Sequence, residues 1–521
     1  MKQLSSSELN HLSKEDMAAM ILQLQHQNAV LMERLAVSDA RRFGRKTEKL
    51  DTLPGQLKLF NEAEDAADET VAEPEIETVV IRRKKTAGKR RDDLSGLPVR
   101  IENHELSEQE LTDIFGANGW KRLPDEVYSR LEYQPAVHEV VEHHVAVYAD
   151  KKKDQMIRAH RPTDLLRNSV ATPSLVAAIM NGKYTNAMPL YRISQELERN
   201  DVILSRATMA NWMIRCSERY LSLVYDRLHQ YLCQQSVLQA DETSVEVTKD
   251  GRSAGSKSYM FVYRTSELLP DKPVILYKYE KTRGHTHAAE FLKGFSGTLV
   301  SDAFSGYKAL EREEKTIQAA FCWAHARRDF TDALKALKGP AKKHAKKSVA
   351  HKALQLIARI YAADGKLKHL SSKERYIRRQ NEVLPLVEAY FAWVKQQDIP
   401  SILSEKTREG LKYSINHEKY LLRFLTEGSI PIDNSATERA IRPFTIGRAN
   451  WRLIDTVHGA QASAVIYSLV ETAKANNLKV YEYLKHLLTE IPKFMDGTSL
   501  DFLDTLMPWS DNLPDICRKT K

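Results

Sequence analysis

Three acidic residues have a sequence context that could place them in one site. Asp241 and Asp302 each follow a short apolar run with the pattern of a buried strand. Glu438 lies in a segment that reads as the start of a helix, with Asp433 as a suitable N-cap and Pro443 as a stop or kink. Two aspartates on strands and a glutamate on a helix supply the oxygen ligands that hard cations such as Mg²⁺ prefer.

This ligand set predicts phosphodiester chemistry with two Mg²⁺ ions, for which Mn²⁺ is a possible substitute. Two such ions, roughly 3.5–4 Å apart, activate a water or a 3′-hydroxyl and stabilise the leaving oxygen. Any one of these acids alone could be a surface residue, since the chain holds 69 Asp and Glu. Glu242 directly follows Asp241 and should point to the opposite face of the strand, so we expect it to be a neutral neighbour outside the metal site.

The sequence around these acids resembles the insertion-sequence-66 transposase family. Residues 433–451 (Asp-Asn-Ser-Ala-Thr-Glu-Arg and onward) resemble its glutamate signature, and 241–243 and 301–307 resemble its two aspartate motifs. Residues 322–328 are similar to its Cys-x-x-His-x-Arg-Arg run. The resemblance extends from about residue 15 to 490 and implies a DDE transposase with an RNase H-like catalytic core. It assigns the catalytic and metal-binding roles to Asp241, Asp302 and Glu438.

Further residues are expected near this site. Cys322 and His325 should orient a strand or a carboxylate, because two ligands do not make a zinc site. Asn434 lies one turn before Glu438 and should support it. Four lysines between 342 and 347 are candidates for DNA binding, although a solvated helix surface explains them almost as well. The candidate contacts to DNA phosphates are Arg442, Arg448, Arg452, Lys342, Lys343, Lys346 and Lys347.

Composition and charge narrow the class of protein. The 521 residues suggest three or four domains, and a hydrophobic content of 42% is enough for real cores. The net charge of +9 favours a polyanionic partner such as DNA. Four scattered cysteines fit a reducing compartment. No apolar run approaches 18 residues, so we expect a soluble intracellular protein with no membrane partner. The resemblance implies that it is a bacterial cytoplasmic, nucleoid-associated protein.

The chain is predicted to be a multidomain α+β protein with an RNase H-like α/β core. Glu438 follows Asp302 by 136 residues, which implies a long α-helical insertion in that core. The expected segments are a coiled-coil helix (1–50), a charged linker (51–96), a small β-containing module (97–160), a helical, helix-turn-helix-like region (161–232), the first part of the core (233–332), the insertion (333–425), the second part of the core (426–475), and a C-terminal helix and tail (476–521).

Local patterns refine this division. The small module resembles a zinc ribbon that has no cysteine, so no zinc is expected, and its residues 137–148 alternate like a strand. A helix opening at Ser205 should bury Met209, Trp212, Met213 and Cys216. In the core we expect strands at 237–247, 257–265, 273–280, 297–302 and 317–321, a hairpin tip at 249–252, and helices at 286–295 and from about 325.

The expected function is metal-dependent cleavage and strand transfer at the ends of a bacterial insertion sequence. Its partners would be the element's terminal inverted repeats, target DNA and at least one further copy of the chain. Small accessory proteins of the same element are further possible partners. Two alternatives stay open: an RNase H-like nuclease or resolvase without strand transfer, and an inactive DNA-binding derivative.

Self-association is predicted from the N-terminal helix. Six residues at three- and four-residue steps occupy the a and d positions of a coiled coil, with Asn28 at an a position that favours a defined register. The alternative is an amphipathic helix packed on its own domain. Deleting residues 1–50 should lower the oligomeric state in light scattering, and an unchanged mass would reject the coiled coil. The a and d residues are Met17, Ile21, Leu24, Asn28, Leu31 and Leu35.

Overall fold

The computed structural model describes most of the chain from residue 163 onward. The described residues are 163–337, 345–495 and 499–520 except Ala254 and Pro270, then 137–149 and 156–160, positions 109 and 113, and single positions between 13 and 35. The chain forms two compact units, one of residues 1–68 and 163–518 and one of 69–162 and 519–521. The expected linker and Lys342 and Lys343 lie outside the described residues.

The smaller unit contains a two-stranded antiparallel hairpin. Its strands are β1 (Val147–Ala149) and β2 (Met156–Arg158). The alternation at 137–148 predicted a longer strand, but regular structure begins only at Val147. Val137 and Val140 are 88% and 90% exposed, so these valines do not bury the face that an amphipathic strand needs.

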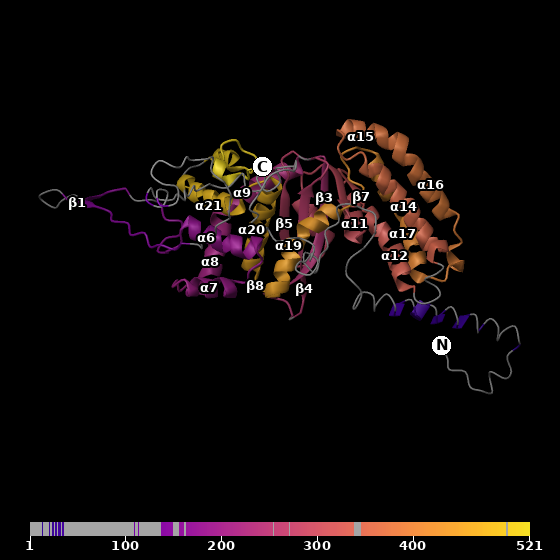
Figure 1. The fold of residues 1–521 in the computed structure, drawn as a ribbon, viewed down its shortest axis with the longest axis horizontal. Helices are drawn as coiled ribbons and strands as arrows, with labels where there is room; N and C mark the ends of the chain where they lie inside the picture. The colour runs from indigo at the N-terminus through magenta and orange to yellow at the C-terminus, as the bar shows by residue number, and fades with distance from the viewer. Residues whose placement is uncertain are drawn as a thin grey trace. The chain divides into compact units, whose positions relative to one another are not determined.

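The described part of the larger unit is built around a six-stranded mixed sheet (Figure 1). The order is β5-β4-β3-β6-β7, with β8 also beside β3. The pairs β3–β4 and β4–β5 are antiparallel, whereas β3–β6, β6–β7 and β3–β8 are parallel. The strands are β3 (Val237–Lys249), β4 (Lys257–Thr265), β5 (Ile275–Glu280), β6 (Gly297–Ser301), β7 (Ile317–Phe321) and β8 (Leu453–Thr456).

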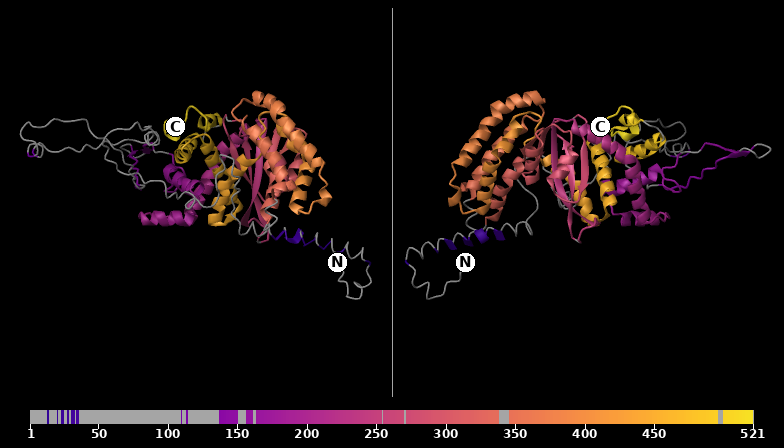
Figure 2. Two further views of the ribbon diagram at one scale, coloured as in Figure 1. Left: turned by 45° about the vertical axis from the view of Figure 1, so that its right-hand side comes forward. Right: turned by 180° about the vertical axis from the view of Figure 1, so that it is seen from behind.

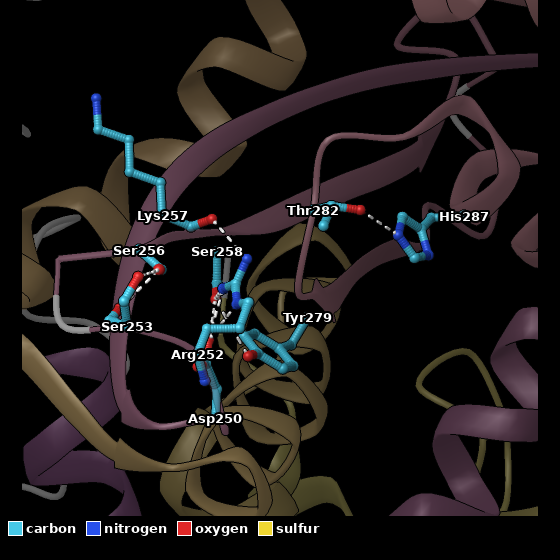
Figure 3. A network of polar contacts seen from close by, with 9 residues as sticks. All are labelled: Asp250, Arg252, Ser253, Ser256, Lys257, Ser258, Tyr279, Thr282 and His287. Carbon is cyan, nitrogen blue, oxygen red and sulfur yellow. Dashed lines mark hydrogen bonds and ion pairs between the residues drawn. The ribbon is translucent and has the colours of Figure 1, made fainter.

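The sheet contains all five expected strands within two residues of their predicted ends, and the mixed α/β class is confirmed. The short strand β8 was not expected. Helix α10 (His285–Phe291) lies in the predicted place between β5 and β6, and α11 (Ser305–Glu313) connects β6 to β7. The β3–β4 hairpin closes on a polar network in which Arg252 and Ser258 both donate to Asp250 (Figure 3). The Arg252 guanidinium is the main cause that lowers the pKa of Asp250 to about 2.

A helical region precedes the sheet. The helix predicted to open at Ser205 is α8, and all four of its expected core residues are buried. Thr172 caps the preceding helix α6 by accepting from the backbone N–H of Leu175 at 3.2 Å. The helices are α6 (Pro173–Met180), α7 (Leu190–Arg199), α8 (Arg206–Cys216) and α9 (Ser222–Cys233), with a π-helical turn joining the last two.

The segment between β7 and the Glu438 helix is helical, as expected, and forms its own core beside β7 (Figure 2). Trp323 lies at the centre of this core, and its indole N–H donates to the carbonyl of Leu421 at 2.8 Å. The helices are α12 (Trp323–Ala336), α14 (Val349–Gly365), α15 (Ser372–Arg378), α16 (Leu384–Lys395), α17 (Glu405–Asn416) and α18 (Glu418–Leu422).

Three helices complete the larger unit: α19 (Ser435–Trp451), α20 (Val457–Ala475) and α21 (Val480–Glu490). Helix α20 covers the edge strand β5. Thr472 accepts the backbone N–H of Ile275 at 3.0 Å, and Ser468 accepts that of Tyr277 at 2.7 Å. The edge of the sheet is therefore closed by side-chain hydroxyls. No helix among the described residues is long and apolar enough to cross a membrane.

A buried arginine ties the insertion to the segment that leads into α19. Arg379 is fully buried and its Nε lies 2.7 Å from Asp364. Its Nη1 donates to the carbonyls of Phe424 and Ile430 at 2.7 and 2.8 Å. One side chain thus joins the short 3-10 turn at Arg423–Leu425 to the loop that follows it and leads into α19.

Replacing Arg379 by alanine should destabilise the fold strongly. The change leaves the Asp364 carboxylate and two carbonyls buried without their donor, a loss of about 3–5 kcal/mol. Arg378→Ala is the matched control, because its pair with Glu382 is exposed to solvent and contributes little to stability. Thermal unfolding of both variants measures the difference, and equal melting temperatures would contradict the anchoring role.

Candidate active site

Sheet register brings Asp241 and Asp302 together. Strands β3 and β6 pair in parallel through Val237–Thr298, Leu238–Leu299 and Gln239–Val300. The same step of 61 residues, continued one residue past the end of β6 at Ser301, aligns Asp302 with Asp241, and the charge of Asp302 is one of those that raise the pKa of Asp241. Neighbouring strands lie about 4.8 Å apart and alternate residues share a face, so both aspartates belong to one face of the sheet.

Asn434 sets the position of the helix that carries Glu438. Its side-chain amide donates to the carbonyl of Ala240 at 2.7 Å, next to Asp241 on β3. Its backbone N–H donates to the Cys322 sulfur at 3.1 Å. Because Asn434 is the N-cap residue of α19, Glu438 lies in the first turn of that helix, beside β3.

One local prediction for this helix is wrong. The N-cap is Asn434 and not Asp433. Its side chain caps no backbone N–H of the helix: the amide donates to β3, and Oδ1 accepts from the Thr437 hydroxyl at 2.8 Å. Pro443 does not end the helix, which continues to Trp451. Ile441 and Phe444 on either side of the proline are buried, so packing outweighs the loss of one backbone hydrogen bond.

The carboxylates act on one another. Burial first, and then the charges of Glu242, Glu438 and Asp302, raise the pKa of Asp241 to about 7, against the lowering effect of the Glu242 backbone N–H. The three predicted acids therefore share one electrostatic environment together with Glu242. This excess of negative charge is what a cation would relieve.

Glu242 is not the neutral neighbour that the sequence suggested. Its side chain is 1% exposed and accepts from the hydroxyl of Tyr307 at 2.7 Å and from Nε of Arg283 at 2.7 Å. The same guanidinium lies 3.7 Å from the carboxylate of Asp302. Glu242 thus belongs to a buried charge network that reaches the site from the opposite face of β3.

His325 lies beside the acids, as expected. Burial first, and then the charge of Arg328, lower its pKa to about 4, although Asp302 and Asp433 act in the opposite direction. Its buried Nδ1 has no hydrogen-bond partner among the residues that the structure describes. Arg328 also lies 3.7 Å from the carboxylate of Glu438.

The site fits a divalent cation by charge and by ligand type. Its donors are carboxylates, the pKa of Asp241 reports crowded negative charge, and the Nδ1 of His325 is a buried nitrogen without a partner. Within the described residues, no three His, Cys, Asp or Glu side chains are grouped closely enough to hold a metal ion as they stand. Instead, Asp302 and Glu438 each lie beside an arginine.

The predicted DNA-binding residues are distributed unevenly. Arg448 reaches back to β3, where its Nη1 donates to the Thr243 hydroxyl at 3.2 Å. Arg442 is half-buried, and burial lowers its pKa. Arg452 is exposed at the end of α19. Lys346 and Lys347 are exposed in a short turn before α14.

Two arginines beside the acids were not singled out from the sequence. Arg328 lies in the Cys-x-x-His-x-Arg-Arg run, so a signal for it existed. Arg283 lies in the turn after β5, where no local pattern distinguishes it from the other basic residues of the chain.

Comparisons with known proteins settle the family. A family model for the transposase IS66 family matches residues 168–462, more than half of the chain. The chain belongs to the IS66 transposase family. Models for the IS66 C-terminal element and for the transposase C of IS166 homeodomain match residues 468–509 and 30–101 of this family member.

Relatives of this IS66 family member occur in Sinorhizobium fredii (strain NBRC 101917 / NGR234). The uncharacterized protein y4qI is 29% identical over 391 residues, which cover 73% of this chain and 70% of the relative. The uncharacterized protein y4jD is 27% identical over 365 residues, covering 68% and 69%. Membership of the family indicates a DNA-processing enzyme, and the homeodomain match indicates DNA binding.

The raised pKa of Asp241 predicts a dependence of stability on pH. Between about pH 4 and 7 the folded protein keeps a proton that the unfolded chain releases, so stability falls as pH rises through this range. Asp241→Asn removes this effect and should raise the melting temperature at pH 8 by a few degrees, with less gain at pH 4. Thermal melts in EDTA test this, and an equal gain at both pH values would contradict it.

Proposed function

We propose that the chain is a DDE transposase that cleaves DNA at the ends of a bacterial insertion sequence and joins those ends to target DNA. The observation that carries the proposal is the placement of three acids, two by strand register and one by the Asn434-anchored helix. Asp241, Asp302 and Glu438 would hold two Mg²⁺ or Mn²⁺ ions. Such ions, when bound, activate the attacking oxygen and stabilise the leaving oxygen of a phosphodiester.

The strand order supports an RNase H-like core. Three antiparallel strands (β3, β4 and β5) are followed by two strands (β6 and β7) that run parallel to β3 on its other side. In this arrangement the central strand β3 carries the first acid and its parallel neighbour β6 leads into the second. The helical insertion then returns the chain to β3 with the third.

The protein's own groups would position the reaction. The sheet holds Asp241 and Asp302 at a fixed spacing. Asn434 holds α19, the helix that carries Glu438, against β3. Arg328 and Arg442 supply positive charge near Glu438 that suits the phosphates of a DNA strand. Cleavage would free a 3′-hydroxyl at the element's end, and that hydroxyl would attack a target phosphodiester directly, without a covalent protein intermediate.

This chemistry requires the partners that the sequence predicts. The terminal inverted repeats would be bound as substrates, and two ends would be brought together by at least two copies of the chain. Accessory proteins of the same element would be additional partners. The homeodomain match over residues 30–101 supports a DNA-binding part outside the acidic site.

Neutral substitutions of the three acids test the assignment. Asp241→Asn, Asp302→Asn and Glu438→Gln should each lower cleavage of DNA carrying the element's ends by about 100-fold or more, because each removes a metal ligand. Binding of the same DNA should change little. Glu246→Gln, on the same strand but beside β8, is the matched control and should keep its activity.

A second assay separates transposase from nuclease. Pre-cleaved ends with free 3′-hydroxyls are mixed with a supercoiled plasmid and Mg²⁺. Joined products support strand transfer, whereas cleavage of intact ends without joining would favour the RNase H-like nuclease. Full activity of Asp302→Asn would reject the metal-site assignment.

A further inference from the structure

The guanidinium of Arg283 lies between two carboxylates and is bound to only one of them. Both its Nε and its Nη2 contact Oε1 of Glu242, with the Nε bond at 2.7 Å. The same Nη2 lies 3.7 Å from Oδ2 of Asp302, too far for a direct hydrogen bond. The guanidinium carbon also lies 3.8 Å from the ring centre of Phe304, in a cation–π contact.

Glu242 is held firmly enough to act as an anchor. Its second oxygen, Oε2, accepts from the Tyr307 hydroxyl at 2.7 Å, and its side chain is 1% exposed. Arg283 is 39% exposed, and the Asp302 side chain is 24% exposed. The fixed member of the trio is therefore Glu242, and the arginine is the member that has room to move.

Removing the charge of Glu242 would change the partner of the arginine. Asp302 is the other carboxylate within 4 Å of Arg283 among the described residues, and an unanchored guanidinium would pair with it directly. A direct ion pair engages the oxygens that a cation needs. The net charge beside Asp302 would also change, because the Glu242–Arg283 pair is neutral overall and Arg283 alone carries a full positive charge.

We propose that Glu242 is a positioning residue that holds Arg283 away from Asp302 and so keeps the Asp302 carboxylate available to a divalent cation. This inference rests on the proposed function, in which Asp302 is a metal ligand. In this proposal Glu242 does not contact the metal. It lies on the opposite face of the strand and acts on Asp302 through the position of Arg283.

The proposal predicts a rescue that a purely structural role would not give. Glu242→Gln should weaken Mn²⁺ binding by about fivefold or more, since a full unit charge then stands roughly 4 Å from a ligand. The double variant Glu242→Gln/Arg283→Met removes the competing cation and should restore the affinity to within about twofold of wild type. Titration of the full-length protein with Mn²⁺, followed by electron paramagnetic resonance, measures both, with Asp302→Asn as the reference for a lost ligand.

The variant should fold, because glutamine matches glutamate in shape and still accepts from Tyr307. A thermal melt of Glu242→Gln checks this. If that variant does not fold, Glu242→Asp, which shortens the side chain by one methylene, takes its place. Its Mn²⁺ affinity should be at least about twofold weaker than that of wild type. Unchanged affinity in the single variant, or a double variant no better than the single, would overturn the proposal alone. Absence of Mn²⁺ binding in the wild-type protein would overturn the proposed function together with this inference.

Discussion

Mutual repulsion among carboxylates is the constraint on which the centre of this protein depends. Burial and the charges of Glu242, Glu438 and Asp302 raise the pKa of Asp241, and burial and the charge of Asp302 raise the pKa of Glu242. Carboxylates that repel one another stay close only if other interactions in the protein hold them in place. The carboxylates are kept together by strand register, by the Asn434 amide and by the arginines beside Asp302 and Glu438. The unfavourable electrostatic energy of the site is therefore offset by stabilising interactions in the surrounding fold.

The helical insertion takes part in this balance. Its core packs beside β7, and Arg379 fixes the carbonyls of the segment that leads to Asn434. The backbone of Trp323 also donates to the carbonyl of Ile432 at 3.2 Å, two residues before that asparagine. The position of Glu438 is thus determined by contacts in a domain that contains none of the three predicted acids.

The sequence predicted the parts of this fold that depend on local pattern. Five strands were foreseen because alternation and apolar runs are local, and the 61-residue spacing of the aspartates proved to be the parallel register of β3 and β6. Strand β8, the anchoring bonds of Asn434 and the Arg283 network depend on residues brought together from far along the chain. The N-cap prediction at Asp433 was wrong because tertiary contacts overrode local preference, and Pro443 does not end the helix. The roles of the three acids remain predictions.

The hydroxyls of Ser468 and Thr472 on the β5 edge have a consequence for incomplete copies of the chain. A polypeptide that ended before α20 would keep every acid of the site but would leave the backbone of β5 open along one side. Open edges of this kind recruit other strands, so such a product would aggregate instead of persisting as a soluble competitor at DNA ends.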